Sequence, residues 1–348
     1  MANQKIKTVI VGASGYTGSD FLRLAHQHPN IEIEGLVAHT HAGRKVEDVF
    51  PHLLYADLPD LVEFKDIDWT NIDAAICGLP HGTAEEIIAK LEGHIKVIDM
   101  SADFRLHDAG TYAEWSGRQH ENPKLLKNAA YGLSELNREA IKSSKLVACP
   151  GCYPTASLLA LVPLLKEGVI DETRLILDAK SGVSGAGRAL KQNTLFCEAG
   201  EGLSPYAIGG HRHTPEIEQE LSIIAGKEVK VNFTPHLVPM SRGELITCHL
   251  TLNAGKTIAD ARTALAAQYD QETFVHLAPV GMIPATQHVR GSNSCLINVF
   301  EGRSKSDLIV ISTIDNLVKG SSGQALQNFN IVFDLDETTG LAQLPLFP

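Results

Sequence analysis

Residues 7–18 read KTVIVGASGYTG, a short apolar run followed by glycines at positions 12, 15 and 18. The run predicts a buried strand, and the pattern of residues 19–28 predicts a helix after it. A helix that starts at such a turn offers backbone N–H groups and a positive dipole end to a pyrophosphate, which glycines allow to approach closely. The spacing differs by one residue from the usual G-x-G-x-x-G. We interpret the segment as a dinucleotide-binding turn, with an ordinary βα turn as the alternative.

The end of the second predicted strand, residues 31–38, bears on the choice of dinucleotide. An NAD site usually has Asp or Glu there to bind the ribose hydroxyls. Residues 37–45 read VAHTHAGRK, with no acidic residue and with two cations, Arg44 and Lys45. These cations are suited to a 2′-phosphate, so the pattern favours NADP. The competing interpretation is a solvated loop face.

Composition excludes several classes of protein. The 348 residues suit two domains, and 44% apolar with 20% charged residues is typical of a globular protein. The formal charge of −11 argues against nucleic acid or an anionic membrane as a partner. We therefore expect a small-molecule ligand, whose negative charges must be met by locally placed arginines and lysines. No apolar run reaches the roughly 18–20 residues that span a bilayer.

The cysteine content and the amino terminus indicate a reducing compartment. Six cysteines in a chain of this length do not form a disulfide framework. The segment from Met1 to Lys7 is short and polar, unlike a targeting signal. We expect the cytoplasm, and a removed organelle peptide stays open as an alternative.

The order of the predicted elements indicates the fold class. Apolar runs at residues 73–77 and 96–100 predict strands, with a helix at residues 83–91 between them. Such alternation predicts a doubly wound, Rossmann-type parallel sheet, which makes the fold class α/β. After about Gly151 a helix at residues 156–166 is followed by strands with less helix between them, which predicts an α+β domain on a mostly antiparallel sheet. We expect those strands at residues 175–179, 229–234, 244–253, 294–300 and 308–313, and a last helix at residues 316–328.

The segment CPGCYPT, residues 149–155, precedes an apolar helix pattern. Pro154 suits the first helical position, so Cys152 would lie at the helix amino terminus, where the dipole lowers a thiol pKa. Cys152 is therefore a candidate nucleophile. A redox pair with Cys149 and half of a zinc site are alternatives. For zinc, the remaining cluster is His211 with His213, and alternate residues of a strand point to opposite faces, so we expect no metal.

Two further segments are candidates for a site. Residues 181–188, SGVSGAGR, follow a predicted strand with small residues that can lie against a ligand, an ordinary turn being the alternative. His211 lies in GGHRHTPEI, residues 209–217. A histidine beside a cysteine is what acid–base catalysis of thiol chemistry needs. The chain has 15 histidines, however, and a structural role competes.

In this order, the segments resemble the N-acetyl-γ-glutamyl-phosphate reductase family of arginine biosynthesis. The most specific are PGCYPT (residues 150–155) and HRHTPEI (residues 211–217). The family is similar to the aspartate-semialdehyde and glyceraldehyde-phosphate dehydrogenases, which share a two-domain plan. The matching segments cover nearly the whole chain and are residues 12–18, 101–105, 150–155, 181–188, 211–217, 233–243 and 315–320.

The resemblance implies an oxidoreductase that uses NADPH to convert N-acetyl-γ-glutamyl phosphate into N-acetylglutamate 5-semialdehyde and phosphate. The intermediate is a thioester on Cys152, with His211 as acid–base and with His213 in packing or substrate contact. Cys149 is incidental, and whether it tunes or oxidises Cys152 stays open. Asn316 is expected to reach the nicotinamide end of the cofactor, which assigns the last helix to the first domain. The implied domains are residues 1–151 with 316–348 for NADP and residues 152–315 for catalysis and dimerisation.

The remaining implied contacts are as follows. The substrate's phosphate and carboxylate require cations, and guanidinium binds either one with two parallel hydrogen bonds. The expected substrate-binding residues are Arg105 and Arg242 first, then Arg188 and Arg212. The expected cofactor-binding residues are Gly12, Ser14, Gly15, Tyr16, Thr17, Gly18, Arg44, Ser181, Gly182, Gly185 and Asn316. We expect a homodimer or homotetramer. The rival functions are a sister reductase for an aminoadipyl or aspartyl phosphate and a non-catalytic NADP-binding regulator.

Overall fold

The computed structural model describes residues 5–91 and 93–348. Residues 1–4, most of the polar amino-terminal segment, lie outside this range. Contacts between residues divide the chain into two compact units, Met1–Pro150 with Ser321–Ala342, and Gly151–Gly320 with Gln343–Pro348. The chain returns to the first unit at Ser321, whereas the resemblance implies a return at residue 316. Among the described residues, no helix is both long and apolar enough to cross a membrane.

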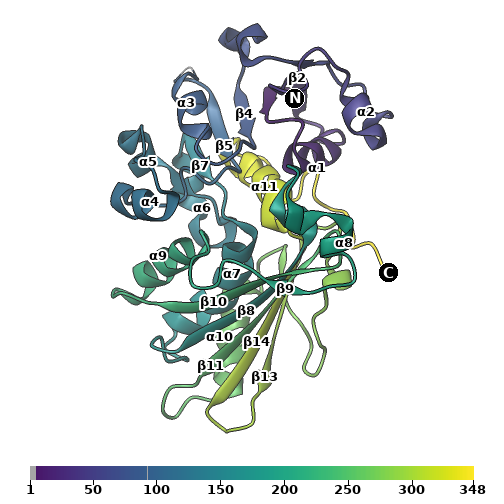
Figure 1. Ribbon diagram of the computed structural model, residues 1–348. Helices are drawn as coiled ribbons and strands as arrows, with labels where there is room; N and C mark the ends of the chain where they lie inside the picture. Colours follow the sequence, from purple (N-terminus) through teal and green to yellow (C-terminus); the bar gives the residue numbers. More distant parts are fainter. Residues whose placement is uncertain (1–4, 92) are drawn as a thin grey trace. The chain divides into compact units, whose positions relative to one another are not determined.

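The first unit is built on a sheet whose described strands all pair in parallel (Figure 1). Their order is β3-β2-β1-β4-β5-β7-β6. The order reverses between β1 and β4, and in such sheets ligands bind beyond the carboxyl ends of the strands at that reversal. The glycine turn after β1 lies at this position. The strands are β1 (Ile6–Val11), β2 (Ile31–Val37), β3 (Leu61–Val62), β4 (Ala74–Cys77), β5 (Lys96–Asp99), β6 (Ala130–Tyr131) and β7 (Leu146–Ala148).

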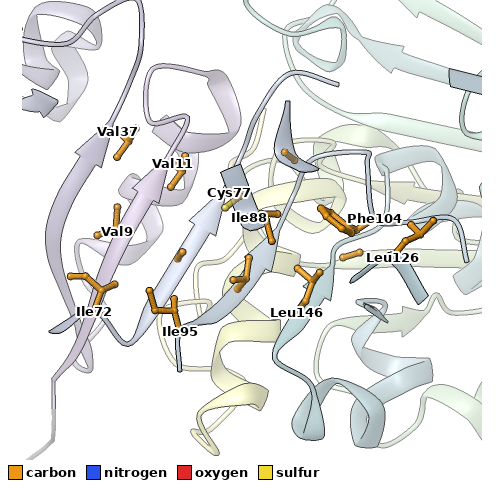
Figure 2. Packing of buried hydrophobic residues seen from close by; sticks show 14 residues of the cluster. Val9, Val11, Val37, Ile72, Cys77, Ile88, Ile95, Phe104, Leu126 and Leu146 are labelled. Atoms are coloured by element: carbon orange, nitrogen blue, oxygen red, sulfur yellow. The ribbon is translucent and has the colours of Figure 1, made fainter. Parts of the chain in front are cut away.

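One face of this sheet forms an apolar core with side chains from α3 and from the segments around it (Figure 2). Val9 and Val11 on β1, like Leu146 and Ala148 on β7, are two residues apart and therefore point to the same face. Fully buried strands of this kind read as continuous apolar runs, which is why the sequence reveals them. The helices of the unit are α1 (Tyr16–Ala25), α2 (Val46–Val49), α3 (Ala84–Ala89), α4 (Ala109–Ser116), α5 (Pro123–Asn128), α6 (Ser134–Ser143) and α11 (Gly323–Val332).

Helix α11 completes the first unit with polar rather than apolar side chains. Its residues Gln324, Gln327, Asn328 and Asn330 are buried. Asn328 donates to the carbonyl oxygen of Gly132 at 2.8 Å. The side-chain oxygen of Asn330 lies 2.9 Å from Nε2 of the buried His28, with which it forms a hydrogen bond. Buried amides are tolerated where such partners satisfy them. The helix is therefore fixed in place by specific hydrogen bonds.

The second unit contains a mixed sheet in the strand order β12-β13-β14-β11-β8-β10-β9. Antiparallel pairs predominate, but β8 pairs with β10 and β12 with β13 in parallel. The expected combination of a parallel sheet with an α+β domain is confirmed. The elements are α7 (Cys152–Lys166), β8 (Leu175–Gly182), α8 (Phe196–Ala199), β9 (Ser204–Pro205), α9 (Thr214–Ala225), β10 (Val231–Val238), β11 (Glu244–Thr251), α10 (Ile258–Tyr269), β12 (Val275–Leu277), β13 (Cys295–Glu301), β14 (Asp307–Ile314) and a π-helical turn (Val318–Ser322).

Helix α7 is the central helix of this unit and is buried along nearly its whole length. It packs on β11, β14, α9 and α10. Pro163 inside the helix has no N–H to donate to the carbonyl of Leu159, and the hydroxyl of Tyr269 on α10 bonds to that carbonyl at 2.7 Å. The helix begins at Cys152, not at residue 156. Pro154 is therefore its third residue, where a backbone N–H would have no partner within the helix in any case.

Candidate active site

Cys152 is the first residue of α7 and is partly exposed. The residue before it, Gly151, caps the helix in an extended conformation without a side-chain cap. The N–H of Gly151 donates to the buried carboxylate of Glu216 on α9 at 2.9 Å, and the N–H of Thr155 donates to the carbonyl of Gly151 at 2.9 Å. The sulfur thus lies at the positive end of a long helix whose start is held by α9. This environment favours a thiolate.

Gly320, in the π-helical turn after β14, leaves room for Cys152. A Cβ atom on Gly320 would lie 2.7 Å from the Cβ of Cys152 and 3.2 Å from the Cδ1 of Ile314. The first distance is shorter than real carbon contacts and the second is unusually short, so a larger residue at position 320 would displace the start of α7. Cys152 therefore packs at the end of β14, where Ile314 is the last residue.

His211 lies in a cluster of aromatic rings around the residue that follows Cys152. Its ring centroid is 5.6 Å from that of Tyr153, and it also contacts Tyr206 at 5.3 Å and His213 at 4.8 Å. The N–H of His213 donates to Nδ1 of His211 at 3.1 Å, so the neutral ring carries its hydrogen on Nε2. Burial, with a smaller contribution from Arg212, lowers the pKa of His211 to about 4. The ring is neutral at neutral pH and offers Nε2–H as a donor.

Tyr206 and Glu244, which no sequence motif indicates, also lie beside Cys152. The Tyr206 hydroxyl donates to the Tyr153 hydroxyl at 3.2 Å. Burial raises the pKa of Tyr206, and the negative charge of Cys152 raises it further. Glu244 is the first residue of β11, is fully buried and faces the thiol of Cys152. The only signal for Glu244 in the sequence is an acidic residue at the start of an apolar strand.

The loops around this site are tied together by Asn316. Its side-chain oxygen accepts from the N–H of Gly243 at 2.8 Å, and its amide donates to the hydroxyl of Ser184 at 2.9 Å. Gly182 packs so tightly that a Cβ there would lie 2.8 Å from the carbonyl oxygen of Ser241. Of the residues predicted from the second glycine loop, Gly185 lies beside Asn316, since a Cβ there would be 3.7 Å from the side-chain nitrogen of Asn316. Asn316 therefore links the loop after β8 to the one before β11.

The four predicted arginines fall in different places. Arg242 is half-buried and lies 3.6 Å from the carboxylate of Asp315. Arg188 and Arg212 are exposed. Arg105 lies in the first unit, nearly buried, and donates to the carbonyl of Met100 at 2.8 Å. The second unit thus contains three of these four cations, and Arg242 is the one adjacent to Gly243 and Glu244.

In the first unit, the glycine turn has the features of a phosphate-binding loop. Gly12 has a φ of +90°, and a Cβ there would lie 2.3 Å from the carbonyl oxygen of Gly78. A Cβ on Gly18 would lie 2.7 Å from the carbonyl oxygen of Gly12. Helix α1 starts after Gly15 with no side-chain cap and no acidic residue in its first turn. Its positive end is therefore accessible to an anion.

The cations after β2 are exposed. Arg44 donates to the carbonyl of Asp48 at 3.2 Å, and Lys45 lies 3.9 Å from Glu47. Both belong to the loop that precedes α2, and each can meet an anion after a side-chain rotation. No acidic residue occupies the tip of β2, since residues 38–41 read AHTH.

Cys149 differs from Cys152 in its surroundings. It is buried in the first unit and accepts from the amide of Asn328 at 3.5 Å. Burial raises the pKa of Cys149 to about 12, so it is a neutral thiol at physiological pH. The two cysteines form no disulfide. The redox alternative has no support in this environment, because the thiolate is the reactive form.

Comparison with known proteins divides the chain near the same boundary between the two units. Residues 7–144 match the family model described as semialdehyde dehydrogenase, NAD binding domain, and residues 152–316 match semialdehyde dehydrogenase, dimerisation domain. A solved aspartate semialdehyde dehydrogenase II from Vibrio cholerae, complexed with ASA, has a TM-score of 0.71 at 17% identity and covers 95% of this chain and 99% of its own. A second solved enzyme of that name, from Candida albicans with NADP, has a TM-score of 0.68 at 18% identity. These two structures show the fold.

Curated relatives are more similar in sequence. The N-acetyl-γ-glutamyl-phosphate reductase of Rhodospirillum rubrum is 49% identical over 351 residues, which cover 99% of this chain and all of the relative. A probable chloroplastic N-acetyl-γ-glutamyl-phosphate reductase of Oryza sativa is 49% identical over 347 residues, or 84% of its length. The chain therefore belongs to the semialdehyde dehydrogenase family and, within it, to the N-acetyl-γ-glutamyl-phosphate reductases.

Proposed function

We propose that this protein reduces N-acetyl-γ-glutamyl phosphate to N-acetylglutamate 5-semialdehyde with NADPH, through a thioester on Cys152. The curated relatives named for this reaction match along the whole chain. The observation that carries the proposal is the position of Cys152 at the start of α7, next to the ring cluster that contains His211. Nucleophilic catalysis by a thiol needs this combination of an activated sulfur with a neighbouring proton donor or acceptor.

The thiolate of Cys152 attacks the acyl carbon of the substrate, a carbon–sulfur bond forms, and the carbon–oxygen bond to phosphate breaks. The tetrahedral oxyanion needs N–H donors from the first turn of α7. Those of Cys152 and Tyr153 are the candidates, because Pro154 has none and the N–H of Thr155 donates within the helix. The first turn is therefore a compact oxyanion site built from two backbone groups.

Bound NADPH supplies the hydride that reduces the thioester carbon. His211 acts on the oxygen of the resulting thiohemiacetal. Because its ring is neutral, Nε2–H donates a hydrogen bond to that oxygen during reduction. In the oxidative direction the hydroxyl proton goes to the other neutral tautomer, whose Nε2 accepts because its hydrogen is on Nδ1 and the bond from the His213 N–H is given up. Collapse of the thiohemiacetal breaks the carbon–sulfur bond and returns the thiolate with the aldehyde.

The residues of the first unit fit NADP. The tightly packed glycine turn and the uncapped start of α1 suit a pyrophosphate, to be held by Gly12, Ser14, Gly15, Tyr16, Thr17 and Gly18. Arg44 would meet the 2′-phosphate. In the second unit, Ser181, Gly182, Gly185 and Asn316 are the proposed contacts to the cofactor.

The same reasoning assigns the substrate's anionic groups to arginines. We propose Arg242 first, because it lies next to Gly243 and Glu244 and is held by Asp315. Arg188, Arg212 and Arg105 are the further proposed contacts. We also propose a homo-oligomer, a dimer or tetramer. The match of residues 152–316 to a dimerisation domain supports it, as does the face of the sheet on which alternate residues of β8 and β11 are half-buried or exposed.

Replacing Arg44 by Glu should weaken NADPH binding by about tenfold or more and change NADH binding by less than about threefold, because the two dinucleotides differ only in the 2′-phosphate. Fluorescence titration with each dinucleotide measures both constants. Lys45→Glu is the matched control, since it makes the same charge change at the next position. An equal loss for NADPH and NADH would contradict the assignment of Arg44.

The reverse reaction tests the proposed function directly, because the acyl phosphate is labile. We expect NADPH to form, followed by its absorbance, when the protein is given N-acetylglutamate semialdehyde, phosphate and NADP. Omission of phosphate should limit the signal to about one NADPH per site, since phosphate must displace the Cys152 thiolate from the thioester before the next turnover. Aspartate semialdehyde and NAD serve as parallel controls. A signal with another semialdehyde alone would move the substrate to a sister reductase, and silence in every combination would refute the function.

A further inference from the structure

Glu244 is a buried carboxylic acid whose place in the fold leaves it few partners. It begins β11, a central strand that pairs with β14 on one side and β8 on the other. Its register partners are Ile314 on β14 and Ser181 on β8. The residue is 0% exposed. Within the described part of the chain, neither carboxylate oxygen receives a hydrogen bond of ordinary geometry.

The start of α7 lies over this carboxyl group. Helix α7 packs on β11 and β14, and the Cβ of Cys152 approaches the same glycine as Ile314, the register partner of Glu244. The thiol faces the carboxylate. Burial raises the pKa of Glu244, and a hydrogen bond from the Cys152 thiol lowers it in part. The nucleophile and an otherwise unsatisfied buried acid are therefore neighbours.

The other charged and titratable groups around Glu244 do not neutralise it. Asp315, which follows β14, adds a second negative charge, and Arg242 is directed to Asp315 at 3.6 Å. Tyr153 on α7 and Tyr206 near β9 also face it, and burial raises the pKa of each phenol. Burial, together with the charge of Asp315, raises the pKa of Glu244 to about 8.

Two acids in contact in such a site do not readily ionise together, so they titrate as a pair. The first proton leaves from the member whose anion is better stabilised. Cys152 is partly exposed and lies at the amino terminus of a helix of 15 residues, whereas Glu244 is fully buried. The helix dipole and the exposure to water both favour the charge on sulfur.

We propose that Glu244 is a positioning residue for the nucleophile: its carboxyl and the thiol of Cys152 share one proton, the carboxyl keeping it while the sulfur carries the single negative charge. This inference rests on the proposed role of Cys152. The neutral carboxyl donates its O–H to the thiolate, which satisfies the buried acid and holds the sulfur in place. No atom is gained or lost in the exchange, since the proton moves only between the two side chains.

The test is the pH dependence of Cys152 alkylation by iodoacetamide, followed by mass spectrometry of the peptide that contains Cys152. The wild-type rate should rise with pH in two steps, because the first ionisation of the pair forms the thiolate and the second removes the O–H donated to it, which leaves the sulfur more nucleophilic. Glu244→Gln should give a single step, since the amide does not ionise. Glu244→Met removes both the ionisable group and the hydrogen bond to the thiolate. In this variant Cys152 should be alkylated about tenfold more slowly at pH 7, which corresponds to a rise of one unit in the thiol pKa.

Glu220→Gln is the matched control. Glu220 lies on α9 of the same unit, and burial raises its pKa to about 7. This variant should keep both steps. A single step in the wild type, a two-step profile that survives Glu244→Gln, or loss of a step in Glu220→Gln would each overturn the proposal.

Alkylation needs no turnover, so the result is independent of the reductase assay. An active wild type with an unchanged profile in Glu244→Gln would sink this inference alone. If Glu244→Gln does not fold, Glu244→Met, which places a similar volume of apolar side chain in the same space, gives the comparison of one step with two.

Discussion

Cys152→Ser should lower kcat of the phosphate-dependent reaction by at least about 10⁴-fold while NADPH binding stays within about twofold of the wild type. A serine hydroxyl at the same place is far less acidic than a thiol, and the dipole of α7 cannot ionise it at neutral pH. The side chains are nearly equal in size, so the packing of residue 152 against Gly320 is kept. Steady-state kinetics in the reverse direction and fluorescence titration with NADPH measure the two quantities.

Cys149→Ser is the control for that substitution. Cys149 is buried, and its sulfur accepts from Asn328, a contact that a hydroxyl also makes. We expect kcat within about threefold of the wild type. Substantial turnover by Cys152→Ser would remove Cys152 as the nucleophile. A dead Cys149→Ser enzyme that still folds would instead require a mechanism with both cysteines.

His211→Asn should lower kcat by about 10²–10³-fold with a much smaller change in the KM for the semialdehyde, because the ring acts on the oxygen of the thiohemiacetal. Asn keeps a polar group in the cluster but does not accept the proton at neutral pH.

The pKa of His211, lowered to about 4, keeps the ring neutral from pH 5 upward. The wild-type kcat should therefore show no loss near pH 6.5 from this histidine, and its own loss should begin only toward pH 4.

His213→Asn separates this role from packing. Its ring contacts both His211 and Tyr153, at centroid distances of 4.8 Å and 5.8 Å. A purely structural role for the histidines predicts similar losses in the two variants. We expect His213→Asn to retain at least about a tenth of wild-type kcat. Equal kcat for the two variants would show that His211 is not the acid–base residue.

Much of the fold could be predicted from local patterns in the sequence. The strands of the first unit are continuous apolar runs because both faces of a parallel sheet are covered, and the glycine turn is recognisable because it lies between the first strand and a helix. The start of α7 was harder to predict. Its first turn contains Pro154, which reads as a first helical residue, yet the helix begins at Cys152 because an N–H is dispensable at the third position too.

The site residues also fall into those that local sequence motifs predict and those that only tertiary contacts bring together. The sequence by itself determined a nucleotide-binding turn, a cysteine at a helix start and the family's reactive motifs, because each depends on residues close together in the chain. It could not reveal that α11, with its run of buried amides, is an interior helix, since polar residues are buried only where distant partners satisfy them. Only the tertiary structure decided that Glu244 meets Cys152, because the register of β11 between β8 and β14 and the packing of α7 across them bring the two acids together.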